Sequence, residues 1–148
     1  MSEAPITVRL TQRQDYQFDN HFGAGIADLR ADEPPPLGQG SGPSPVQLLC
    51  AAVGNCLAAA LLFALRKCRQ KPEPIACEVS AETGRNAEKR LRVAAMTVRL
   101  TLGVPAAAIE HPDRVLGSFE DFCTVTGSVR ASFPVTVTVF DALGVQLK

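Results

Sequence analysis

A run of apolar residues from position 46 to position 65 is the strongest pattern in the chain. The run is longer than an ordinary strand, and helix signals lie at both of its ends. Ser44 can act as N-cap with Pro45 at the first helical position, and Gln47 stands where a capping box has Glu or Gln. We therefore predict a helix that begins at Ser44-Pro45 and ends near the cations at 66–69, before Pro72.

Alternating apolar and polar residues on both sides of this helix predict strands. The expected strands are 6–10, 16–18, 26–29, 75–81, 91–102 and 133–139. Prolines and glycines fill residues 33–45, which we expect to form a long loop. A helical turn at 105–111 and a helix at 112–122 should precede the last strand. This order is typical of an α+β fold with a mostly antiparallel sheet.

The predicted long helix is apolar on all sides, whereas one sheet covers only one side of a helix. A second copy of the chain would cover the rest, so we expect an intimate homodimer in which helix packs against helix. The small residues that would permit this contact are Ala51, Ala52, Gly54, Ala58 and Ala59. A membrane-spanning helix is the alternative for such a length, but the alanine content and the amphipathic strands on both sides favour a protein interior.

Length and charge narrow the possible functions. The chain has 148 residues, which suits one domain over 1–148 with a real core. Its 15 basic and 15 acidic residues cancel, and it has no Trp and one Tyr, so we expect neither a nucleic-acid partner nor a membrane partner. The start, Met1-Ser2-Glu3-Ala4-Pro5, lacks the basic and apolar regions of a secretory signal, which favours a cytoplasmic location.

Five cysteines are the main candidates for chemistry. A reducing compartment keeps them as thiols, and the absence of a C-x-x-C pair argues against a zinc site. His21 and His111 are isolated from other ligand residues, so we expect no metal and no bound cofactor.

Cys56 lies inside the predicted long helix, and Cys123 follows the amphipathic stretch 112–122. Both could be ordinary core residues. The active alternative is redox chemistry between two sulfur atoms, which requires a cation near Cys56 because the thiolate is the reactive form. The candidate cations are Arg9, Arg13 and Arg30, and the sequence does not choose among them.

The other cysteines differ in their settings. Cys123 begins a segment that could start a new helix, where free N–H groups would favour a thiolate. Cys50 and Cys77 fit apolar faces and are expected in the core. Cys68 lies between two cations and is the rival reactive thiol.

Three stretches together resemble the OsmC/Ohr family, the osmotically inducible and organic hydroperoxide resistance proteins. They are the helix opening 42–49, the segment 51–56 that ends in Cys56, and the segment 122–125 that contains Cys123. The resemblance implies an intertwined α+β homodimer in which antiparallel sheets wrap around central apolar helices that carry cysteine. It also implies that Cys56 is the peroxidatic cysteine and Cys123 the resolving cysteine, with an external dithiol reductant.

The resemblance is closer to the OsmC-like redox proteins than to the organic hydroperoxide resistance branch. That branch has a Glu after the helix-start proline, and this chain has Val46 followed by Gln47. Gln47 and one of Arg9, Arg13 or Arg30 would support the site. Two other functions fit the sequence: a dimeric small-ligand-binding protein with packing cysteines, and a redox sensor that acts through Cys68.

Overall fold

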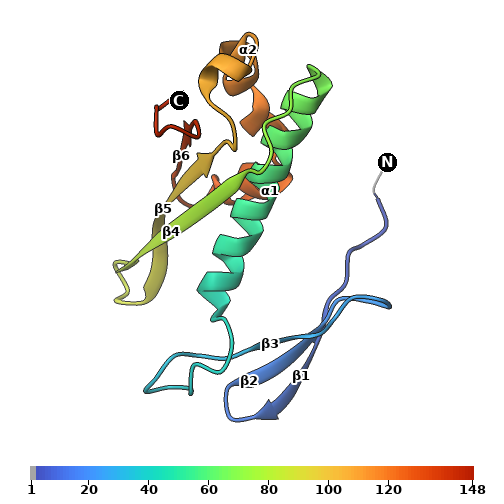
Figure 1. Ribbon diagram of the computed structural model, residues 1–148. Helices are drawn as coiled ribbons and strands as arrows, with labels where there is room; N and C mark the ends of the chain where they lie inside the picture. The colour runs from blue at the N-terminus through green and yellow to red at the C-terminus, as the bar shows by residue number, and fades with distance from the viewer. Residues whose placement is uncertain (1–2) are drawn as a thin grey trace. The chain divides into compact units, whose positions relative to one another are not determined.

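The computed structural model describes residues 3–148, which form two compact units joined between Leu48 and Leu49. The first unit holds a three-stranded antiparallel sheet of β1 (Arg9–Gln14), β2 (Gln17–His21) and β3 (Leu29–Ala31), in that order (Figure 1). The three strands predicted before the long helix are present, although each begins later than predicted. Every residue of β1 is exposed, so this sheet does not bury a core of its own.

The loop between β3 and the long helix is organised around one buried carboxylate. Asp32 is 2% exposed and accepts hydrogen bonds from the backbone N–H groups of Glu33, Gln39 and Ser41 at 2.8, 3.2 and 3.0 Å. The Ser41 hydroxyl donates a further bond at 2.8 Å. Hydrogen bonding, led by the Ser41 backbone, lowers the pKa of Asp32 despite its burial. A segment rich in proline and glycine is thereby held in one conformation without a strand ladder.

Helix α1 (Pro45–Lys67) has the predicted ends and the predicted cap. The Gln47 backbone N–H donates to the Ser44 hydroxyl at 3.2 Å, and the Ser44 backbone N–H donates to Gln47 Oε1 at 2.9 Å. This reciprocal pair is a capping box, in which two otherwise unpaired donors at the helix start are satisfied. The side-chain carbonyl of Gln47 is therefore occupied in starting the helix.

The second unit is built on a sheet of order β4-β5-β6. Strands β4 (Ala76–Arg85) and β5 (Leu91–Thr101), which correspond to the strands predicted at 75–81 and 91–102, pair as an antiparallel hairpin. Strand β6 (Val135–Phe140) pairs with β5 in parallel, so the sheet is not antiparallel throughout. A parallel pair cannot be joined by a tight turn, and the residues between β5 and β6 form the required crossover.

The crossover contains η1 (Ala106–Ala108), α2 (Pro112–Leu116), η2 (Phe119–Phe122) and α3 (Thr124–Val129). The single helix predicted over 112–122 is wrong, because the chain leaves helical geometry at Ser118, where φ is −132°. Gly117, directly before it, is a weak helix former. The break allows Phe119 to be fully buried in the core.

One face of helix α1 packs against this sheet, and Figure 1 shows the helix beside β4 and β5. The buried residues of α1 are Val53, Gly54, Leu57, Leu61 and Leu65. A Cβ atom at Gly54 would lie 2.8 Å from Val79 Cγ2 and 3.3 Å from Cys77 Sγ. The expectation that Gly54 meets a second helix is therefore wrong: it is the point of closest approach to β4 of its own chain.

Residues on the other side of α1 are exposed in the second unit as described. Ala51, Ala52 and Ala59 are exposed, and Phe63 is 66% exposed. The helix is long and apolar enough to cross a membrane by length and composition, with a mean hydropathy of 2.3 over its most apolar window. Its Val53, Leu57, Leu61 and Leu65 face nevertheless belongs to the core cluster with β5 and β6. This is how a core helix packs on a sheet.

Candidate active site

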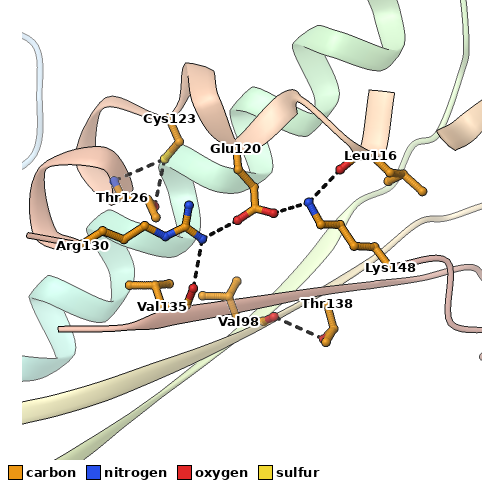
Figure 2. Close-up of polar contacts among 9 residues, drawn as sticks. All are labelled: Val98, Leu116, Glu120, Cys123, Thr126, Arg130, Val135, Thr138 and Lys148. Carbon is orange, nitrogen blue, oxygen red and sulfur yellow. Dashed lines mark hydrogen bonds and ion pairs between the residues drawn. The ribbon is translucent and has the colours of Figure 1, made fainter. Parts of the chain in front are cut away.

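Cys123 occupies the junction between η2 and α3. Its side chain is the N-cap of α3, so the expectation that a helix starts there is confirmed. The sulfur atom accepts a hydrogen bond from the Thr126 backbone N–H at 3.5 Å, and the thiol donates to Thr126 Oγ1 at 3.0 Å (Figure 2). Cys123 is 2% exposed and Thr126 is fully buried. The thiol is therefore fixed in direction in a site closed to solvent.

Cys56 lies in the middle of α1 and is half-buried. Burial raises the pKa of the Cys123 thiol, and its side-chain hydrogen bond with Cys56 raises it further. The two bonds to Thr126 act in the opposite direction but do not outweigh these effects. The Cys56 thiol from α1 is thus near enough to the Cys123 thiol from the crossover to raise the pKa of Cys123.

A network of charged side chains lies beside Cys123. Glu120 accepts hydrogen bonds from Arg130 Nη2 and from Lys148 Nζ (Figure 2). Arg130 also donates to the Val135 carbonyl at 3.0 Å, and Lys148 also donates to the Leu116 carbonyl at 2.7 Å. Sequence analysis missed this network because its members lie at unrelated spacings and no local pattern connects them.

The other three cysteines line two hollows of the second unit. Cys50 and Cys77 border a hollow of about 410 Å³ between α1 and β4, and burial raises the pKa of both thiols. Cys50 is half-buried and packs against the core, whereas Cys77 is exposed, so the expectation of a core position is wrong for Cys77. Cys68 is exposed and borders a second hollow, of about 390 Å³, together with Phe63 and Phe122.

The candidate arginines belong to the first unit, whereas both thiols belong to the second. Arg13 pairs with Asp19 at 3.1 Å, and Arg30 approaches the same carboxylate at 3.6 Å. Arg9 is exposed on β1. Asp19 therefore holds two of the three guanidinium groups near each other, and the choice of the cation that serves Cys56 stays a prediction.

Among residues 3–148, no group of three or more His, Cys, Asp or Glu side chains is arranged to hold a metal ion. His21 instead contacts Asp28, with Nδ1 and Oδ1 2.8 Å apart.

Comparison with known proteins begins with structure. The fold is similar to an OsmC-like protein from Vibrio cholerae, with a TM-score of 0.78, 15% identity, and coverage of 93% of this chain and 100% of that one. It is also similar to an organic hydroperoxide resistance protein from Legionella pneumophila, with a TM-score of 0.71, 16% identity, and coverage of 93% and 98%.

A third similar structure is the organic hydroperoxide resistance protein OhrB of Bacillus subtilis, with a TM-score of 0.69, 16% identity, and coverage of 90% and 97%. A search of curated proteins gives no significant match. The sequence itself matches the family model of OsmC-like proteins over residues 38–138, a stretch that runs across the junction of the two units. Two thiols on an α+β scaffold and this match lead to the same conclusion: the chain belongs to the OsmC-like protein family.

Proposed function

We propose that this protein is a thiol-dependent peroxidase that reduces organic hydroperoxides, with Cys56 as the nucleophile and Cys123 as the resolving cysteine. The observation that carries the proposal is the interaction of the Cys56 and Cys123 thiols across two separate elements. Membership of the OsmC-like family agrees with it. Solved structures with the same fold include proteins named for organic hydroperoxide resistance.

The reaction proceeds in two steps at these thiols. The Cys56 thiolate attacks the terminal oxygen of the hydroperoxide, the O–O bond breaks, and the leaving alkoxide takes a proton to become an alcohol. Cys56 is then a sulfenic acid. The Cys123 sulfur attacks the sulfenic sulfur, and water leaves as the Cys56–Cys123 disulfide forms. A dithiol reductant restores both thiols and becomes a disulfide itself.

The hollow of about 390 Å³ offers a place for the alkyl group of the substrate. Phe63 and Phe122 line it and are 66% and 72% exposed. Phe63 follows Cys56 by two helical turns, about 10 Å along the axis, and Phe122 directly precedes Cys123. Phe119, in contrast, is fully buried in the core and does not line this hollow. Cys56 and Cys123 do not themselves line this hollow, and Lys67 and Arg114 are also part of its lining, but its two phenylalanines favour an alkyl hydroperoxide over hydrogen peroxide.

We further propose that the working protein is a single-domain, cytoplasmic homodimer. The exposed apolar side of α1 includes Phe63, and the sheet of β1–β3 also exposes apolar residues such as Leu10 and Phe18. Exposed apolar surface of this kind favours contact with another protein surface. A second copy would cover both surfaces. Analytical ultracentrifugation at micromolar concentration should give the mass of a dimer. An active monomer under these conditions would contradict the proposal.

One experiment tests the peroxidase. Reduced protein treated with less than one equivalent of cumene hydroperoxide should form a single disulfide, between Cys56 and Cys123, in peptide maps made without reduction. Cys56→Ser should stop hydroperoxide consumption, and Cys50→Ser is the matched control on the same helix. Equal oxidation of Cys50, Cys68 and Cys77 would contradict the proposal.

A second function is favoured by the same hollow. A non-catalytic dimer could use the apolar space between Phe63 and Phe122 to bind a small lipid-like ligand, with the cysteines in packing roles. In that case Cys56→Ser would lower the free energy of unfolding but leave ligand binding intact. Alkylation separates the two functions, because a catalytic Cys56 reacts with iodoacetamide below pH 7 and a packing cysteine reacts only on unfolding. A redox sensor at Cys68 would instead be oxidised there first.

A further inference from the structure

Glu120 is a carboxylate held between two cations in a largely enclosed place. Its side chain is 13% exposed, and it accepts hydrogen bonds from both Arg130 and Lys148 (Figure 2). Burial disfavours the charge on Glu120, but the bonds from Lys148 and Arg130 prevail and its pKa is lowered. The carboxylate is therefore ionised throughout the neutral range, and both ion pairs persist there.

The ion pair between Glu120 and Arg130 spans the segment that carries Cys123. Glu120 lies in η2 and Arg130 is the C-cap residue of α3, so their contact ties together both ends of residues 120–130. Within this segment the Cys123 backbone N–H donates to the Glu120 carbonyl at 3.1 Å. Glu120 therefore binds the two cations through its side chain and the Cys123 backbone N–H through its carbonyl.

The network also anchors this segment to the rest of the second unit. Arg130 reaches the start of β6 through the Val135 carbonyl, and Lys148 reaches the end of α2 through the Leu116 carbonyl. The Lys148 ammonium also lies 5.2 Å from the centre of the Phe119 ring, which is buried in the core. Movement of Cys123 toward or away from α1 therefore strains contacts to two other elements, β6 and α2.

Disulfide formation depends strongly on such placement. The two sulfur atoms must come to about 2.05 Å with a restricted torsion about the bond. A displacement of about 1 Å of a reacting group can cost on the order of 100-fold in rate. We propose that Glu120, fixed by Arg130 and Lys148, is a positioning residue for the reaction between the Cys56 sulfenic acid and Cys123. This role rests on the proposed peroxidase function, and the step needs no further reactant, since the Cys123 proton leaves with the sulfenic oxygen as water.

The experiment compares two rates in one protein. Reduced wild type, Glu120→Gln and Lys148→Met are mixed with one equivalent of cumene hydroperoxide, and samples are quenched over time. Dimedone labelling measures the Cys56 sulfenic acid, and non-reducing peptide maps measure the disulfide. Sulfenic acid should form within twofold of the wild-type rate in both variants. The disulfide should form about tenfold more slowly, so that labelled Cys56 accumulates.

Three controls separate positioning from a general loss of structure. Lys148→Arg keeps a cation at Glu120 and should restore at least half of the wild-type rate of disulfide formation. Glu73→Gln breaks a different ion pair, with Arg66, and should leave both rates unchanged. Equilibration with oxidised and reduced dithiothreitol gives the disulfide stability without peroxide, and Glu120→Gln should lower it about tenfold by loss of preorganisation.

The outcomes distinguish this role from the proposed function. A wild-type protein that forms no sulfenic acid at Cys56 would show that the peroxidase is wrong, and the positioning role would fall with it. A wild-type protein that forms both species, with Glu120→Gln and Lys148→Met matching both of its rates, would refute the positioning role alone. If either variant loses its near-UV circular dichroism, the positioning role is judged from the comparison of Lys148→Met with Lys148→Arg. Equal rates of disulfide formation in these two variants would refute the positioning role.

Discussion

Cys123 and Thr126 form a two-way contact: the thiol donates to the Thr126 hydroxyl at 3.0 Å, and the Thr126 backbone N–H donates to the sulfur at 3.5 Å. The N-terminal end of a helix thus meets a sulfur atom whose charge is otherwise disfavoured by burial and by Cys56. This contact matters for chemistry because the resolving step depends on how readily Cys123 becomes nucleophilic.

The first prediction concerns the Thr126 hydroxyl. The hydrogen bonds between Cys123 and the Thr126 hydroxyl and backbone N–H both lower the pKa of Cys123, because both groups can donate to a thiolate, against the larger effects that raise it. Thr126→Val removes the side-chain bond at similar volume, so the Cys123 pKa should rise further. Disulfide formation should slow at pH 7, recover at higher pH, and shift its pH–rate profile to the alkaline side in quenched-flow measurements. Ser128→Ala, which removes a hydroxyl bond to the Thr124 carbonyl in the same helix, should leave the profile unmoved.

A second prediction concerns the cation that serves Cys56. Arg9→Gln, Arg13→Gln and Arg30→Gln each remove one guanidinium from the first unit. The variant that removes the activating cation should need a higher pH for alkylation of Cys56, because a nearby positive charge favours the thiolate. Iodoacetamide labelling of Cys56 against pH, read by mass spectrometry, measures the shift. If all three variants label like the wild type, the cation does not come from these residues.

A third prediction concerns the contact between α1 and β4. Gly54→Ala places a methyl group 2.8 Å from Val79 Cγ2 and 3.3 Å from the Cys77 sulfur, so the Val79 side chain must shift or the helix and strand must separate. The free energy of unfolding should fall by about 1–3 kcal/mol, as for other overpacked cores. Gly127→Ala is the matched control: it lies in α3 with open space around its Cβ position and should stabilise by about 0.5–1 kcal/mol. Urea unfolding checks both, and equal stability of the two variants would contradict the close contact.

A fourth prediction concerns the loop held by Asp32. Its pKa is lowered from the usual 3.8, so the stabilisation from its hydrogen bonds is present above that pH and is lost as pH falls through the lowered value. Asp32→Asn should therefore expose the loop at neutral pH, as faster proteolytic cleavage within residues 33–44. Glu33→Gln changes the neighbouring carboxylate and keeps the bonds to Asp32. Equal cleavage of Asp32→Asn and wild type would show that the carboxylate does not order the loop.

Local patterns predicted the elements whose causes are local. The capping box at Ser44 and Gln47 and the hairpin of β4 and β5 depend on residues that are close in sequence or that alternate along a strand. The start of a helix at Cys123 was also recognisable, because a side-chain acceptor before a polar first turn is a local signal.

Contacts between distant residues could not be predicted in this way. The spacing of apolar residues predicted one helix over 112–122. The break at Ser118 follows from the burial of Phe119, which only the assembled core requires. The Glu120 ion pairs depend on where β6 and the segment after it bring Arg130 and Lys148. The direction of β6 was likewise unreadable from its own sequence, since a strand that alternates suits either partner orientation.

The parallel pairing of β5 with β6 has a further consequence for Cys123. Cys123 lies in the crossover, which must return along the sheet before the chain enters β6. Arg130 links the crossover to the first residue of this strand by its hydrogen bond to the Val135 carbonyl. The position of the Cys123 sulfur is thus set by the order and direction of the strands and not by a surface loop that can vary freely. Substitutions in the crossover can alter the reactivity of the Cys123 thiol, but moving the thiol elsewhere would require a different connection between β5 and β6.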